Sequence, residues 1–171
     1  ALFALIVGKP DVALLAVIFS GCCMGFLFHN FHPASLFLGD AGSMFLGTML
    51  AGFGLLVAKP EDAVSTLAIG VLLGLLFFDT GLVSIMRVMH GLKITQGGKD
   101  HTSHRLCNLG LSVQGSVTAL FAANFVFGTA AIAMLKLERN SALLIPLVLF
   151  LVGATCWFLL KDSYTYGKET N

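Results

Sequence analysis

Five long apolar segments restrict what this chain can fold into. A helix needs about 20 mainly apolar residues to cross a bilayer, and only a helix satisfies its own backbone hydrogen bonds inside lipid. The second segment approaches this length if Ala41–Ser43 form its first turn. The sequence therefore predicts an all-α bundle with about five transmembrane helices and a single membrane domain over residues 1–171. The five segments are Val12–Phe28, Met44–Ala58, Val64–Met86, Val113–Leu135 and Ala142–Leu160.

The composition supports a membrane protein and argues against other classes. Hydrophobic residues make up 57% of the chain and charged residues 11%, whereas soluble domains contain about 25% charged residues. The net charge is +1, so no broad basic face is available to neutralise nucleic-acid phosphates. The four cysteines show no metal-ligand spacing. The expected partner is the lipid bilayer, and no nucleic acid is expected.

Alternation of the five spans sorts the loops into two sets. One face receives the N-terminus and the links at 59–62 and 136–141, with four Lys or Arg side chains. The other receives loops 30–43 and 87–112 and the C-terminal tail, with six. The positive-inside rule assigns the second face to the cytoplasm. We therefore expect an outside N-terminus, a cytoplasmic C-terminus, and both polar loops on the cytoplasmic face.

Asp40 lies between two glycines, directly before the second apolar segment. In Gly39-Asp-Ala-Gly-Ser43, either Asp40 or Ser43 could cap the following helix. The same geometry also suits a site, because free N–H groups at a helix N-terminus bind phosphate, glycines permit close approach, and a carboxylate can hold Mg²⁺. The local pattern does not separate these two interpretations.

Asp79 is an acid inside the third apolar segment, eight residues before Arg87. Eight residues of helix span about 12 Å, which places Asp79 in the cytoplasmic half of its span. Ionisable residues within spans are costly and default to functional hypotheses. Asp79 is therefore a candidate intramembrane functional acid, and the alternative is a structural acid bonded to a neighbouring helix.

The loop at 87–112 contains the third polar feature, Asp100-His-Thr-Ser-His-Arg105. If this stretch is helical, His101, His104 and Arg105 share one face through spacings of three and four residues. Two imidazoles and a guanidinium on one face suit phosphate or pyrophosphate oxygens. A zinc site is less favoured, since no Cys or third His lies at ligand spacing. The alternative is a solvated basic loop.

Three stretches resemble, in order and spacing, the polyprenyl-phosphate N-acetylhexosamine-1-phosphate transferases. This glycosyltransferase-4-type family includes the phospho-MurNAc-pentapeptide translocases. The resemblance implies transfer of a sugar 1-phosphate from a UDP-N-acetylhexosamine to polyprenyl phosphate, usually undecaprenyl phosphate, with release of UMP. It also implies the cytoplasmic face of a bacterial plasma membrane and the first membrane step of cell-envelope glycan synthesis. The stretches are Asn30–Gly47 (Asn-x-x-Pro-Ala-x-x-Phe-x-Gly-Asp-x-Gly-Ser), Phe78-Asp-Thr80 with Arg87, and Asp100–Ser112.

The resemblance also implies roles for individual residues. Asp40 matches the family's acid that binds Mg²⁺ or Mn²⁺. His101 and His104 match the outer positions of a His-x-His-His pattern that contacts the nucleotide-sugar phosphates. Asp40, His101 and His104 are thus the predicted catalytic residues. The predicted phosphate-binding residues are Asn30, Gly39, Gly42, Ser43 and Arg105.

The chain departs from the family pattern in two ways. Ser103 stands where many members carry the middle histidine, and this variant resembles the GlcNAc-type transferases more than the peptidoglycan translocases. The family's upstream Asp-Asp and Asn/Asp-Gly-x-Asp-Gly motifs are absent, so we expect the C-terminal part of a longer enzyme, inactive alone. The alternatives are a translocase-like enzyme, a non-catalytic membrane module, and a transporter fragment with Asp79 and His101 as proton relay. A homodimer is left open.

Overall fold

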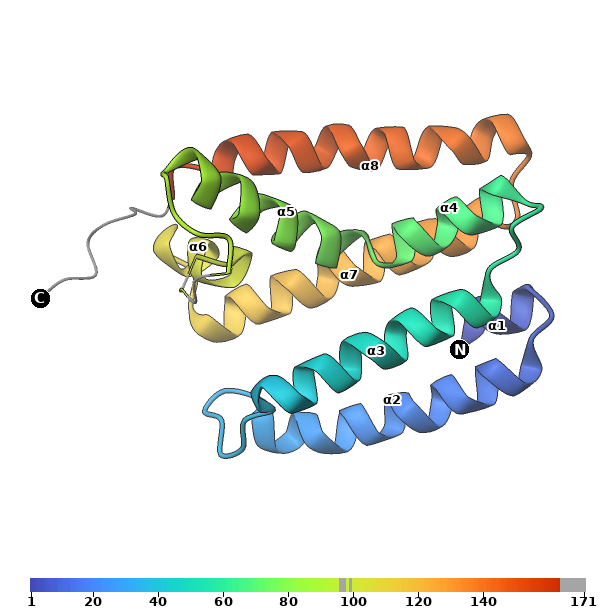
Figure 1. Cartoon of the computed structure of the whole chain (residues 1–171), viewed down its shortest axis with the longest axis horizontal. Coiled ribbons are helices and arrows are strands. Elements are labelled where there is room, and N and C mark those ends of the chain that lie inside the picture. The colour runs from blue at the N-terminus through green and yellow to red at the C-terminus, as the bar shows by residue number, and fades with distance from the viewer. Residues whose placement is uncertain (96–97, 99, 164–171) are drawn as a thin grey trace, which may run out of the picture. The chain divides into compact units, whose positions relative to one another are not determined.

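The computed structural model describes residues 1–95, 98 and 100–163. Parts of the predicted loop 87–112 and of the C-terminal tail lie outside these residues. All regular secondary structure in the described residues is helical, which confirms the all-α prediction (Figure 1). The helices are α1 (Leu2–Ile6), α2 (Pro10–Asn30), α3 (Gly39–Val57), α4 (Ala63–Leu72), α5 (Gly74–Met89), α6 (Thr102–Asn108), α7 (Val113–Met134) and α8 (Arg139–Leu160).

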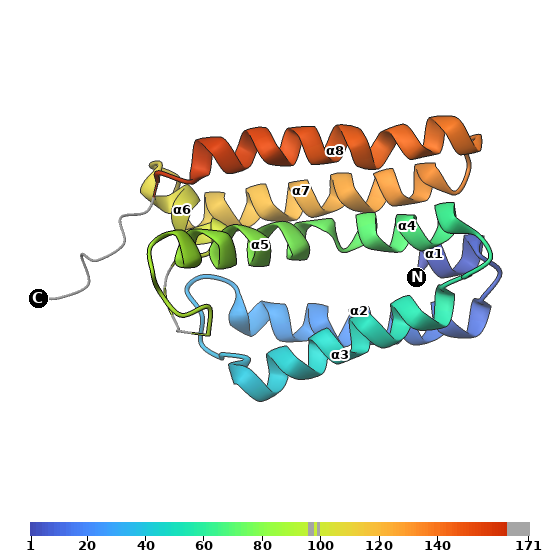
Figure 2. The same ribbon diagram turned by 45° about the horizontal axis from the view of Figure 1, so that its top comes forward.

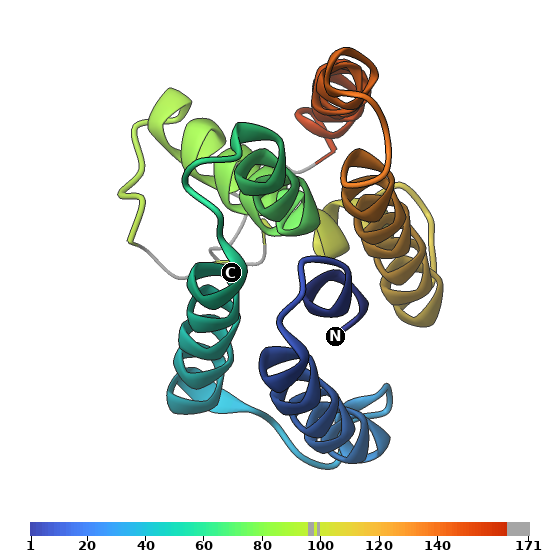
Figure 3. The same ribbon diagram turned by 90° about the vertical axis from the view of Figure 1, so that its right-hand side faces the viewer.

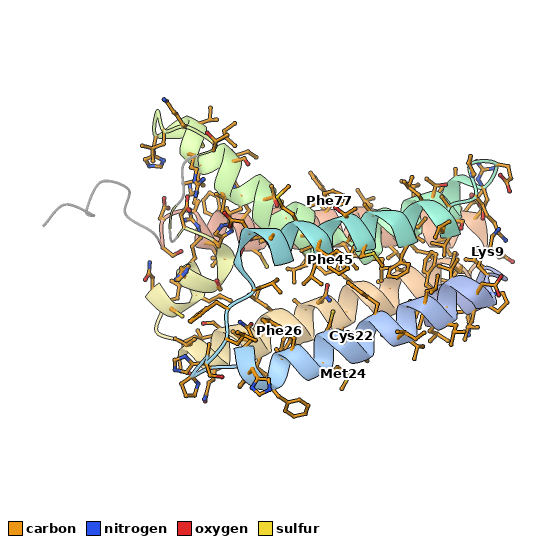
Figure 4. The ribbon with its side chains drawn as sticks, turned by 60° about the horizontal axis from the view of Figure 1, so that its bottom comes forward. Lys9, Cys22, Met24, Phe26, Phe45 and Phe77 are labelled. Carbon is orange, nitrogen blue, oxygen red and sulfur yellow. The ribbon has the colours of Figure 1, made fainter. Side chains whose placement is uncertain are left out.

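The long helices match the predicted membrane spans. Among the described residues, α2, α3, α7 and α8 are each long and apolar enough to cross a bilayer. α4 and α5 pass the same test only together, as a broken span or a re-entrant loop, so the described residues hold four or five candidate spans. Only 6–11% of the residues in the four single spans are buried. Figure 4 shows the side chains of Met24 on α2, Phe45 on α3 and Phe77 on α5. Such apolar, exposed helices characterise a multi-pass membrane protein.

The predicted single helix Val64–Met86 is divided in the structure, and that part of the prediction is wrong. α4 ends at Leu72, α5 begins at Gly74, and their axes are bent by 63°. A Cβ atom at Gly74 would lie 2.6 Å from two ring carbons of Phe127 in α7. The missing side chain lets this ring approach the backbone where the helix breaks. Hydropathy does not register such a break, because both halves are apolar.

Residues Ala1–Ile69 form one compact unit. α2 and α3 lie side by side in it, joined by the loop 31–38 (Figures 1 and 3). The Phe19 ring of α2 packs against the rings of Phe45 and Phe53 in α3, with centroid distances of 6.3 and 5.6 Å. α1, which the sequence does not predict, packs against α2. Asp40 lies in this unit, in the first turn of α3.

Residues Gly70–Asn171 form the second compact unit, described as far as Ser163. α7 packs along α8, α5 packs on α7, and α6 lies at the ends of α5, α7 and α8 (Figure 2). Leu82 and Met86 of α5 form a small core with Leu160 of α8. Leu106 of α6 packs against this core. The stretch Thr102–Asn108, for which the sequence left helical structure open, is a helix that packs on the ends of three others.

Candidate functional site

Asp79 joins α5 to the beginning of α6. Its Oδ2 lies 2.7 Å from His101 Nδ1, and its Oδ1 accepts the Thr102 N–H at 2.6 Å. His101 is the N-cap residue of α6, but its side chain makes no capping hydrogen bond. The carboxylate of Asp79 therefore satisfies a backbone donor that an N-cap side chain would otherwise take. The predicted candidate acid and the first predicted histidine are direct neighbours.

A buried ion pair holds the residue before His101. Arg87 donates from Nε to Asp100 Oδ2 at 2.7 Å and from Nη2 to Oδ1 at 2.6 Å. A third donor, Nη1, reaches the Ile94 carbonyl at 2.8 Å. Burial alone would raise the pKa of Asp100, but the bonds from Arg87 hold it below its usual range. These two hydrogen bonds of the ion pair connect α5 to Asp100, the residue that precedes the N-cap of α6.

Arg105 is fully buried and bonds to backbone carbonyls. Its Nε donates to the Asp100 carbonyl at 2.8 Å, and Nη1 donates to those of Leu160 and Lys161 at 3.0 and 3.1 Å. His101 and His104 are exposed, so the prediction that Arg105 shares their face is wrong. The physical reason is that the last carbonyls of α8 lack helical donors, and a guanidinium supplies them. Binding of substrate phosphate by Arg105 stays a prediction.

Asp40 has a different setting, in the first turn of α3 and exposed. Among the described residues, no side chain caps this helix. Ser43 instead donates from Oγ to the Asp40 carbonyl at 2.9 Å. Gly39 adopts a positive φ of 66°, which favours glycine. The capping interpretation is therefore wrong for both Asp40 and Ser43, and the carboxylate is accessible.

Asn30 and Gly42 have structural roles in the described chain. The Asn30 side-chain amide donates to the Leu36 carbonyl at 2.9 Å and so closes the loop before α3. A Cβ atom at Gly42 would lie 2.6 Å from Leu38 Cγ, so glycine makes room for that side chain. These contacts do not test whether either residue binds phosphate. The shared cleft for Asp40 and His101 also stays a prediction.

Asp100 is missing from the predicted site residues. Its sequence signal is weak: it is the only acid in the predicted loop 87–112. Nothing in the local pattern indicates its partner Arg87, which lies 13 residues earlier in the chain. Arg87 contributed to the family resemblance, but without an assigned role. The ion pair is thus a feature that only the structure reveals.

Asp40 is the predicted metal ligand in the first unit, and it is exposed. Within residues 1–95, 98 and 100–163, no three His, Cys, Asp or Glu side chains gather into a metal site. Mg²⁺ commonly binds through one or two carboxylates together with substrate phosphates and water. One exposed carboxylate fits that donor set as a single ligand, and the Mg²⁺ or Mn²⁺ site stays a prediction.

Comparisons with known proteins identify relatives. The model of "Glycosyl transferase family 4" matches residues 1–58. The "Probable undecaprenyl-phosphate N-acetylglucosaminyl 1-phosphate transferase" of Bacillus subtilis is 36% identical over 135 residues, which cover 78% of this chain and 38% of the relative. The "Decaprenyl-phosphate N-acetylglucosaminephosphotransferase" of Mycobacterium leprae is 29% identical over 168 residues, covering 90% and 42%.

A third relative is similar over a shorter stretch. The "Phospho-N-acetylmuramoyl-pentapeptide-transferase" of Thermosynechococcus vestitus is 61% identical over 46 residues, covering 27% of this chain and 12% of the relative. No solved structure matches the chain. The chain thus spans about two fifths of the length of the first two relatives, at 38% and 42%.

Proposed function

Because this chain belongs to glycosyl transferase family 4, we propose that it is part of a polyprenyl-phosphate N-acetylhexosamine-1-phosphate transferase. The observation that carries the proposal is the 36% identity, over 78% of the chain, to a relative named for N-acetylglucosaminyl 1-phosphate transfer. N-acetylglucosamine is accordingly the first sugar to test. The proposed donor is the UDP-sugar, and the proposed acceptor is undecaprenyl phosphate.

In the proposed reaction, a phosphate oxygen of the lipid attacks the phosphorus that carries the sugar. The bond from that phosphorus to the bridging oxygen breaks, and UMP leaves with this oxygen. The product is a lipid-linked pyrophosphate sugar. Phosphoryl transfer depends mainly on positioning and electrostatic stabilisation. The Mg²⁺ that Asp40 would hold supplies positive charge to the pyrophosphate. His101 and His104, exposed near the start of α6, are proposed to contact the phosphates.

We also propose that the active face is the cytoplasmic face of a bacterial plasma membrane. The six Lys and Arg residues on the side of the polar loops, against four on the other, support this orientation.

A second candidate function is phospho-N-acetylmuramoyl-pentapeptide transfer. The 61% identity to such an enzyme favours it, but that similarity covers 27% of the chain.

The Asp40→Asn substitution tests the proposal in the complete coding sequence that contains this chain. Mg²⁺-dependent release of UMP from UDP-N-acetylglucosamine is measured in membranes supplied with undecaprenyl phosphate. We expect a loss of about 100-fold or more, the order seen when a group that stabilises transition-state charge is removed. Asp11→Asn is the matched control, because Asp11 is also an exposed acid in the first turn of a long apolar helix. Near-normal turnover of Asp40→Asn would remove Asp40 from the site.

A further inference from the structure

The contact between Asp79 and His101 restricts which ring nitrogen can face a ligand. An ionised carboxylate only accepts hydrogen bonds, so the proton between Asp79 Oδ2 and His101 Nδ1, 2.7 Å apart, belongs to Nδ1. The other oxygen, Oδ1, already accepts the Thr102 N–H at 2.6 Å. The Thr102 N–H therefore orients the Asp79 carboxylate toward the imidazole ring of His101. Nε2 is the ring nitrogen that Asp79 leaves available.

The backbone on both sides of His101 is anchored. Before it, the Asp100 carboxylate is bound by Arg87 and the Asp100 carbonyl by Arg105 Nε. After it, Thr102 is 4% exposed and its N–H is bound by Asp79. The His101 side chain is nonetheless 51% exposed. A histidine whose backbone is anchored while its ring is half exposed suits contact with a ligand better than it suits core packing.

We infer that Asp79 is a positioning residue, which fixes the Nδ1–H form of His101 and presents Nε2 to a phosphate oxygen of the substrate. This inference rests on the proposed function for the identity of the ligand. A phosphate oxygen accepts hydrogen bonds, so a ring that bridges it to Asp79 carries protons on both nitrogens. The carboxylate then balances the charge of the imidazolium. The arrangement parallels the carboxylates that orient histidines in metal sites and catalytic triads.

The first test reads the proton on His101 without measuring activity. Nitrogen NMR spectra are recorded on the complete protein with ¹⁵N-labelled histidine, and His101→Gln assigns the signals by their loss. We expect Nδ1 to remain protonated at high pH while Nε2 gives up its proton. In Asp79→Ala, both neutral forms of the ring should be populated. A His101 that keeps its proton on Nε2 at high pH in the unsubstituted protein would overturn the inference.

The second test asks whether Asp79 acts through His101. Substitutions in groups that orient an active side chain commonly reduce activity by about 10- to 100-fold, and we expect a loss of this size in Asp79→Ala. The double variant with His101→Ala should be no worse than His101→Ala alone. Losses that multiply in the double variant would show that Asp79 acts independently and contradict the inference.

A third variant separates positioning from folding. Asp79→Asn retains an oxygen that can accept the Thr102 N–H, so α6 should keep its contact with α5. Turnover that falls in Asp79→Asn at an unchanged melting temperature supports positioning. Asp79 would have a structural role if both Asp79 variants lost turnover and melting temperature in parallel, and if the double variant of Asp79→Ala with His101→Ala lost more than either single variant. If the unsubstituted protein releases no UMP, the proposed function fails, while the spectra still decide the state of His101.

Discussion

The polar segment at the start of α3 and the polar segment around α6 are built in different ways. Around Asp40 the side-chain contacts are local: Ser43 bonds three residues back, and Asn30 bonds six residues ahead. Around α6 they are distant in sequence: His101 lies 22 positions after Asp79, and Leu160 lies 55 positions after Arg105. The first segment leaves its acid exposed, whereas the second encloses two guanidinium groups and one acid.

The comparison teaches that the two segments should respond differently to substitution. Changes around Asp40 should alter activity more than stability, because few contacts depend on its side chain. Changes around α6 should alter stability first, because buried charges there depend on one another. The predictions below concern the complete protein in detergent micelles, with the free energy of unfolding as the measured quantity.

The largest expected effect follows loss of the buried acid. Asp100→Ala removes the partner of Arg87, whose side chain is 8% exposed. Breaking a buried ion pair from one side costs about 3–5 kcal/mol, because the remaining charge stays buried. Asp40→Asn is the control and should change the free energy of unfolding by less than about 0.5 kcal/mol. Similar values for the two variants would remove the contrast between the segments.

A smaller loss is expected at Arg105. Arg105→Met keeps much of the side-chain length but leaves the carbonyls of Asp100, Leu160 and Lys161 without this donor. The Leu160 carbonyl keeps its hydrogen bonds from Ser163, so the cost falls mainly on the other two carbonyls. A buried acceptor that loses its partner costs about 1–3 kcal/mol, and we expect a loss of about 2 kcal/mol. His104→Gln, at an exposed position one residue earlier, should have little effect. An Arg105→Met protein as stable as His104→Gln would show that these bonds contribute no net stability.

The acid dependence of stability should also separate the segments. Burial raises the pKa of Asp100, but the hydrogen bonds and charge of Arg87, together with a backbone hydrogen bond and the neighbouring His101, outweigh it and hold the folded pKa below its usual value. An acid with a lowered folded pKa contributes stability above its unfolded pKa of about 3.9, and this is lost as pH falls through the folded value. Unfolding measured from about pH 6 down to pH 2 should lose this contribution in the unsubstituted protein. Asp100→Asn should show a weaker pH dependence over that range, and an identical profile would contradict the assignment.

The sequence predicts the helices well and the tertiary contacts poorly. Apolar length locates α2, α3, α7 and α8, because the lipid requirement acts on each segment by itself. The break at Leu73 is missed because both halves are apolar, and the Phe127 ring that packs on Gly74 comes from a helix distant in sequence. Arg105 is misplaced because the carbonyls that it binds lie 55 and 56 residues away. Contacts of this kind leave no periodic trace in the sequence.

The smallest expected effect comes from a matched pair of glycines, one in each segment. A Cβ atom at Gly98 would lie 3.0 Å from Asp100 Oδ1 and 3.2 Å from Arg87 Nη2. The two-point ion pair restricts these atoms, so Gly98→Ala should cost about 1 kcal/mol, at the low end for crowding a packed site.

At Gly42 the added atom meets the Leu38 side chain at 2.6 Å, which must move. Alanine is favoured over glycine in a helix by about 1 kcal/mol, so Gly42→Ala should be near neutral. Urea titration of both variants measures the difference. A cost at Gly42 that equals or exceeds the cost at Gly98 would mean that the start of α3 is packed as rigidly as the buried ion pair. The local contacts of Asp40 would then be as demanding as the distant contacts around α6.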